Sequence, residues 1–278
     1  MSRRASARKL ACSIVAPLAA ALALVAGASA QTTTSPPDFS SNRTAWKALD
    51  GADYLMVPGS PSPITNDPAH PHRGNNEGGQ PAYRISDTTN SNLKQWAKEV
   101  MNKDNQEVLA GKIAFTPGSS CVPPGIPTFL QEGGLHYFIQ TPKEVVMILE
   151  ADAQVRRIYL GVPHSPNVKP SWHGESIGHY EGDTLVVDTI GLNTKTFIDH
   201  YRTPHSEKLR VVERFRMIDD GKTLEARITI DDPETFHEPW QAIRRWRRDQ
   251  ATLQEYACAE NNLHLFDYGM PVDDRPDF

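Results

Sequence analysis

The alternation of hydrophobic and polar positions is clearest in residues 209–217, which predicts a β-strand there. The opposite face of this strand is mostly basic. The apolar face carries Leu209, Val211, Phe215 and Met217, and the basic face carries Arg210, Val212, Arg214 and Arg216. Glu213 points to the apolar face. Because a carboxylate there is unfavourable unless it has a partner or a chemical role, Glu213 is the first candidate functional residue.

The residues that follow predict the register of this strand. Asp219-Asp-Gly-Lys222 is typical of a tight turn, and apolar residues alternate again over 223–230. A two-residue loop at Asp220-Gly221 predicts four cross-strand pairs: Met217 with Leu224, Phe215 with Ala226, Glu213 with Ile228, and Val211 with Ile230. Every pair except that of Glu213 is apolar, so the pattern and the turn predict the same register.

Two interpretations of Glu213 compete. In the functional one, the carboxylate faces a cavity with a raised pKa and takes part in acid–base chemistry or orients a ligand. In the structural one, an arginine of a neighbouring strand neutralises it. His205, in the turn Pro204-His-Ser206, is predicted at the rim of the sheet, where it would share proton transfer with Glu213. The alternative is that Pro-His-Ser is only a turn.

A second predicted hairpin, over 176–190, adds further candidates. His179 and Asp188 share one face, and Tyr180 lies on the other. If the first face points inward, His179 and Asp188 join the catalytic group. If the second does, they are solvated, and Tyr180 becomes a ligand-binding residue.

The remaining pattern predicts a mainly β protein. Besides the two hairpins, strands are expected at 136–140, 144–150, 155–160, 240–248 and 253–258. No helical pattern alternates with them, so an antiparallel barrel or sandwich is expected over residues 121–278. Residues 31–120 read as an extended Pro/Gly-rich arm with one amphipathic helix over 92–110.

Aromatic and basic residues supply the remaining candidates. Trp172, Trp240 and Arg244 are predicted to bind the ligand by stacking or charge, although a core position or an ion pair explains each of them too. The histidines lack metal-site spacing, so neither a metal nor a cofactor is expected. Ser176 matches G-x-S-x-G, but a strand follows where a nucleophile elbow needs a helix.

The N-terminus reads as a targeting segment. Four basic residues, an apolar run and Ala28-Ser-Ala30 predict a signal peptide over 1–30, cleaved near Ala30, and export to the periplasm or the medium. Removing it changes the formal charge from −5 to −9, which argues against nucleic-acid binding. No other stretch is long enough for a transmembrane span. The two remaining cysteines, Cys121 and Cys258, are expected to form a disulfide in that compartment.

Several motifs together resemble a large family of exported, functionally uncharacterised bacterial proteins. They are the run 172–189, Trp-His-Gly-Glu-Ser-Ile-Gly-His-Tyr-Glu-Gly-Asp-Thr-Leu-Val-Val-Asp-Thr, and the shorter runs 203–209, 212–216, 231–233 and 258–262. The resemblance implies a lipocalin-like barrel, and no catalytic residue can be carried over from the family.

Three functional hypotheses follow from the candidate residues. The first is an enzyme using Glu/His acid–base chemistry, as a lyase, isomerase or hydrolase, on a small organic or carbohydrate-derived molecule. The second is a noncatalytic small-molecule-binding protein of the cell envelope. The third is a structural protein in which an arginine pairs with Glu213. The oligomeric state is not predicted.

Overall fold

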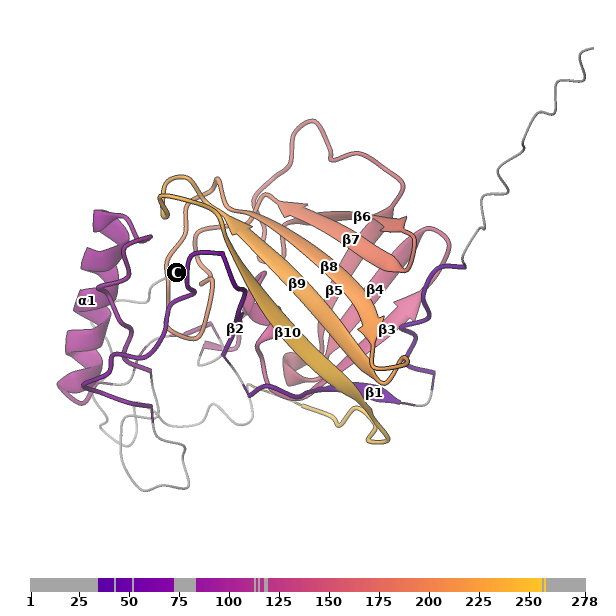
Figure 1. Cartoon of the computed structure of the whole chain (residues 1–278), viewed down its shortest axis with the longest axis horizontal. Helices are drawn as coiled ribbons and strands as arrows, with labels where there is room; N and C mark the ends of the chain where they lie inside the picture. The colour runs from indigo at the N-terminus through magenta and orange to yellow at the C-terminus, as the bar shows by residue number, and fades with distance from the viewer. Residues whose placement is uncertain are drawn as a thin grey trace, which may run out of the picture. The chain divides into compact units, whose positions relative to one another are not determined.

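The computed structural model describes residues 35–42, 44–51, 53–72, 84–112, 114, 116–117, 120–256 and 258 (Figure 1). These residues all belong to the compact unit Thr34–Phe278. The predicted signal peptide over 1–30 lies outside them, in the unit Met1–Thr33.

Nine strands close into a barrel, as the alternating pattern predicts. The sheet order is β1-β3-β4-β5-β6-β7-β8-β9-β10, and β10 pairs with β1 to complete the ring. A tenth, two-residue strand, β2 (Leu55–Met56), pairs with β10. The barrel strands are β1 (Ala45–Ala48), β3 (Leu135–Gln140), β4 (Glu144–Leu149), β5 (Gln154–Leu160), β6 (Glu175–Glu181), β7 (Thr184–Ile190), β8 (Arg210–Ile218), β9 (Thr223–Asp231) and β10 (Trp240–Asp249).

One of the nine barrel strands differs from the nine expected. The predicted strand at 253–258 is wrong, because residues 251–256 have no regular secondary structure. β1, from the segment expected to be an extended arm, lies between β3 and β10 instead. The indole of Trp46 in β1 is buried and donates to the carbonyl of Phe39 at 2.9 Å, which anchors this short strand.

One strand pair departs from the antiparallel pattern. β5 and β6 run parallel, with Ile158, Tyr159 and Leu160 opposite Ser176, Ile177 and Gly178. A parallel pair needs a long crossover, and residues 161–174 provide it. The barrel therefore has a seam with only three residue pairs between β5 and β6.

The predicted register of the β8–β9 hairpin is confirmed in all four pairs. Met217 lies opposite Leu224, and Glu213 lies opposite Ile228. The strands end at Ile218 and Thr223, so the loop spans four residues rather than two. Asp219, Asp220 and Gly221 adopt positive φ angles there, a conformation that Asp and Gly tolerate better than other residues.

The predicted helix is present as α1 (Gln95–Leu109), at one side of the barrel in Figure 1. Hydrogen bonds from Lys94 N to Thr235 O and from Trp96 Nε1 to Glu234 O hold its start against the β9–β10 loop. Two short 3-10 helices, η3 (Thr128–Leu130) and η4 (Ala151–Ala153), flank β3 and β5. Among the described residues, no helix is both long and apolar enough to cross a membrane.

The barrel interior contains a histidine that should make stability depend on pH. His136 in β3 is buried against Trp246 and hydrogen bonds to the carbonyl of Phe129, and burial lowers its pKa to about 4. Burial also lowers the pKa of His173 to about 4. Between pH 4 and 6.5 the unfolded chain thus binds more protons at these histidines, so their contribution to stability is full above pH 6.5 and lost towards pH 4. Burial raises the pKa of Asp199 to about 6, so this single group makes stability fall as the pH rises and offsets about one of the two histidines.

We therefore expect the free energy of unfolding to rise between pH 4.5 and pH 7. Replacing His136 with Gln, whose amide N–H can donate in place of the ring N–H, should reduce this rise by about 2 to 3 kcal/mol. Urea unfolding at the two pH values measures it. The matched control is His237→Gln, because His237 is exposed. An unchanged slope in His136→Gln would show that His136 does not titrate differently on folding.

Candidate functional site

Glu213 is completely buried in the barrel and paired with an arginine. Both of its carboxylate oxygens accept hydrogen bonds from Arg156 of β5, at 2.7 and 2.5 Å. Ser176 of β6 and Thr189 of β7 lie opposite each other in the strands between, and both hydroxyls accept from the same guanidinium. This arrangement corresponds to the structural interpretation of Glu213, in which an arginine compensates the buried carboxylate.

His205 lies inside a loop rather than at an open rim. Its Nδ1 must donate to the carbonyl of Ser206, at 2.9 Å, so its Nε2 accepts from the hydroxyl of Thr196, at 2.8 Å. Burial lowers the pKa of His205, which favours this neutral form. Both ring nitrogens are thus occupied, and no contact joins His205 to Glu213 among the described residues.

The face of the β6–β7 hairpin that carries Tyr180 points inward. His179 and Asp188 therefore lie on the outer face, as the second alternative predicts. Asp188 accepts two hydrogen bonds from Arg210 at 2.9 and 2.8 Å on the outer face. Burial alone would raise the pKa of Asp188, but the hydrogen bonds and charge of Arg210 keep it below its usual value. His179 is exposed and pairs with Glu181, and Tyr180 accepts a hydrogen bond from Gln140.

The three predicted ligand-binding residues outside that hairpin contact different parts of the protein and do not form one site. Trp240 is core, with its ring against Tyr54 and Phe236. Arg244 is buried and donates to backbone carbonyls of Leu130, Gly51 and Asp53. Trp172 is half-buried in the crossover before β6. The structure brings none of them together with Glu213 by a direct contact.

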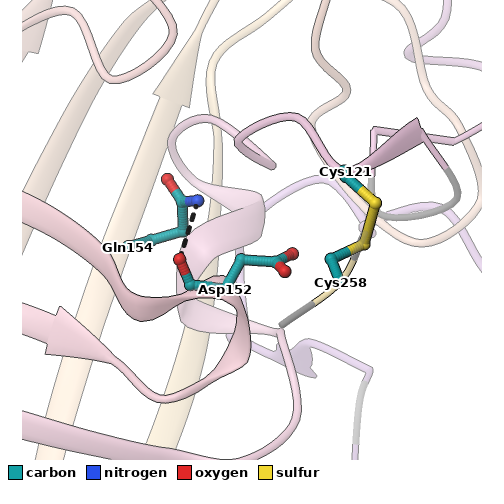
Figure 2. Close-up of a disulfide and its surroundings, with 4 residues drawn as sticks. All are labelled: Cys121, Asp152, Gln154 and Cys258. Atoms are coloured by element: carbon teal, nitrogen blue, oxygen red, sulfur yellow. Dashed lines mark hydrogen bonds between the residues drawn. A yellow bond between two sulfur atoms is a disulfide. The ribbon is translucent and has the colours of Figure 1, made fainter. Parts of the chain in front are cut away.

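The predicted disulfide between Cys121 and Cys258 is confirmed (Figure 2). Their Cα atoms are 5.5 Å apart, within the usual range. It joins the segment before η3 to the chain beyond β10, with Asp152 of η4 beside it in Figure 2. This crosslink is typical of proteins from oxidising compartments.

The sequence Pro-His-Ser occurs at 163–165 and again at 204–206, and it has the same structural role in both places. The backbone N–H and the hydroxyl of Ser206 both donate to Asp232, at 2.6 and 2.8 Å. In the same way, Ser165 donates from its N–H and its hydroxyl to Glu175, at 2.7 and 2.5 Å. Each serine thus fastens a loop to a carboxylate near a strand end, which favours the interpretation of Pro-His-Ser as a turn.

A histidine and a glutamate that sequence reasoning missed meet in an open pocket at one end of the barrel. His200 Nε2 lies 3.6 Å from Glu132 Oε1, and about a quarter of each side chain is exposed. The pocket, which we call the end pocket, has a volume of about 590 Å³, a size typical of small-molecule sites. It is lined by Lys47, Ala48, Gly51, Gln131, Glu132, Gly133, Gly134, Leu135, Glu150, His200, Ala251, Thr252 and Gln254.

Hydrogen bonds fix the backbone of the two turns that carry this pair. Glu132 follows η3, and its N–H donates to Thr128 O. His200 lies in a turn that the buried carboxylate of Asp199 fixes by accepting from the N–H groups of Tyr201 and Thr203. No local pattern could have revealed the pair, because the two residues come from different connections between strands.

Within the part of the chain that the structure describes, no three His, Cys, Asp or Glu side chains are placed to hold a metal ion. Comparison of the chain with protein-family models, with curated proteins and with solved structures finds no match.

Proposed function

We propose that the chain is an exported β-barrel enzyme in which Glu132 and His200 carry out acid–base chemistry on a small organic or carbohydrate-derived molecule. The supporting observation is the pairing of these two side chains in the end pocket, where both remain accessible to a ligand. An imidazole and a carboxylate in one pocket can pass a proton to and from a substrate. Lyase, isomerase and hydrolase chemistry all fit such a pair.

The geometry of the pocket supports the same proposal. The 3.6 Å between His200 Nε2 and Glu132 Oε1 is longer than a hydrogen bond. Catalytic contacts, however, often shorten only when a substrate binds. Lys47, an exposed residue of β1, adds a positive charge to the lining and can orient a polar substrate. Glu150 is less available, because its two oxygens accept from the N–H groups of Leu135 and Gln254.

A noncatalytic small-molecule-binding protein of the cell envelope is the second candidate. The observation that favours it is the separation of 3.6 Å between Glu132 and His200, which is too long for a hydrogen bond, so Glu132 does not orient the imidazole as the partner of a general base usually does. In this case the two side chains fix the orientation of a ligand without changing it.

Both candidates are exported proteins. The inference of export rests on the basic and apolar pattern of residues 1–30. The disulfide between Cys121 and Cys258 is consistent with an oxidising destination, the periplasm or the medium.

Replacing Glu132 with Gln is expected to lower turnover at least about 100-fold while ligand affinity is kept, because the amide cannot exchange a proton with the substrate. The assay uses protein purified after export, incubated in D₂O with a panel of sugars, sugar acids and hydroxy acids, with ¹H NMR following deuterium uptake and new products. His200→Asn should show the same loss.

The matched control is His70→Gln, since His70 forms an exposed pair with Asp67 at 2.8 Å outside the end pocket. A compound that binds without change, and whose affinity falls in Glu132→Gln, would establish the binder instead. Turnover that survives both pocket substitutions would refute the assignment of Glu132 and His200.

A further inference from the structure

The outer face of the barrel is mostly charged over β7–β10 and richer in apolar side chains over β3–β5, where the pair Arg157–Glu144 interrupts them. On β7–β10, outward arginines pair with carboxylates, as Arg210 does with Asp188 and Arg216 with Glu225. On β3–β5, the register places Ile139 beside Val146, and Tyr137, Ile148 and Val155 in one row. Ile139 and Val155 are about half exposed. Contiguous exposed apolar surface on a soluble domain is typical of a binding site.

This apolar surface ends in a groove at the seam between β5 and β6. The groove has a volume of about 360 Å³. Val155, Arg157 and Tyr159 of β5 line it on one side, and Ser165, Asn167, Val168 and Lys169 of the crossover line it on the other. It exists because β6 begins only at Glu175 and, among the described residues, pairs with only residues 158–160 of β5, so the first half of β5 has no strand partner on that side.

Several contacts hold the crossover wall of this seam groove in place. Ser165 is fastened to Glu175, and Ser171 N donates to Gly191 O. Val168 packs so closely on Gly191 that a Cβ there would lie 2.2 Å from the valine Cγ1, and Gly191 has a φ of +69°. A non-glycine residue at 191 would therefore displace the wall. The groove is a formed feature rather than a gap beside a loose loop.

The charges in the seam groove leave one cation available. Arg157 is bonded to Glu144 at 2.8 Å, and Arg156 beneath it is neutralised by Glu213. Glu175 receives its hydrogen bonds from Ser165 and His164. Lys169 is exposed, and no carboxylate of the described residues forms an ion pair with it. The groove thus joins two features. One is the partly exposed ring of Tyr159, which has the Arg157 guanidinium over one face at 5.5 Å from its centroid, and the other is an ammonium group that no carboxylate of the described residues pairs with.

We propose that the seam groove binds a small molecule that has a flat apolar body and one carboxylate, such as an aromatic acid. The body lies on Val155 and on the part of the Tyr159 ring that Arg157 does not cover, and the carboxylate pairs with Lys169. This site is separate from the end pocket and does not depend on the function proposed for it. An aromatic ring and a nearby cation match the two parts of such a ligand.

The test compares 2-naphthoate with its neutral analogue 2-naphthamide by isothermal titration calorimetry on the full exported protein. We expect saturable one-to-one binding of naphthoate and weaker binding of the amide. Lys169→Gln should weaken naphthoate about fivefold, and Tyr159→Ser should weaken both compounds. Lys195→Gln is the matched control, because Lys195 is exposed in the β7–β8 connection and lines neither the end pocket nor the seam groove.

Three outcomes would overturn the proposal: no saturable binding of naphthoate, equal affinity for acid and amide, or equal effects of Lys169→Gln and Lys195→Gln. Sedimentation velocity gives a fourth. A dimer that Tyr159→Ser dissociates would assign the apolar face to a second copy of the chain instead.

Discussion

Replacing Glu213 with glutamine is expected to lower the free energy of unfolding by about 3 to 5 kcal/mol, because the substitution leaves the buried Arg156 without a counter-charge. Arg156 and Glu213 are both essentially inaccessible to solvent, and two hydrogen bonds join them. A glutamine retains the shape but not the charge. Urea unfolding of both proteins at pH 7, followed by tryptophan fluorescence, measures the difference.

A double substitution separates the pair interaction from the cost of an unpaired charge. Arg156→Met combined with Glu213→Leu removes both charges, so it should cost much less than Glu213→Gln alone. Arg210→Gln is the matched control on the outer face, where Arg210 pairs with Asp188 in partial contact with solvent, and it should change stability by no more than about 1 kcal/mol. If Glu213→Gln were as mild as Arg210→Gln, the buried pair would not be a structural element.

The same substitution bears on the role of Glu213 in any chemistry. If Glu213 only fixes the architecture, a folded Glu213→Gln protein should retain turnover and ligand affinity at the end pocket. A loss of turnover without a loss of stability would return Glu213 to the list of catalytic candidates.

Local features of the fold were predictable from the sequence because their causes are local. The β8–β9 register follows from alternation on both sides of one turn, so Met217 and Leu224 could be paired without knowledge of the rest of the chain. Helix α1 follows from an apolar stripe of helical period. The disulfide follows from the number of cysteines and the inferred compartment.

Features that depend on distant partners were not predictable in this way. The four residues of β1 have too short an alternation to stand out, and their role as the closing strand follows from pairing with β3 and β10. The identity of the Glu213 partner was equally hidden. Arg156 is one of many arginines, and its selection requires the order of β5, β6, β7 and β8 around the barrel.

The candidate site illustrates the same limit. Glu213 stood out because it is a charged residue on an apolar face. This pattern correctly predicted a buried charge, but it did not show whether the charge is structural or catalytic. Glu132 and His200 interrupt no pattern, since both lie in connections between strands. Only the closed barrel brings these two connections to one end, where the pocket forms between them.

Replacing Cys121 and Cys258 with serine is expected to lower the free energy of unfolding by about 5 kcal/mol in the chain-entropy description, since the crosslink closes a loop of 137 residues. Nearly the whole barrel lies inside this loop, so the disulfide restricts the unfolded chain from before η3 to beyond β10. Guanidinium unfolding of the double variant against the oxidised protein measures the loss.

The unmodified protein with reduced cysteines is the matched comparison, because it lacks the crosslink but keeps both side chains. It should lose about as much stability as the double variant. A loss in the variant with none on reduction would mean that serine disturbs local packing at positions 121 and 258 and that the crosslink adds little. Equal losses would instead assign the effect to the crosslink itself, which the chain-entropy description places in the unfolded state.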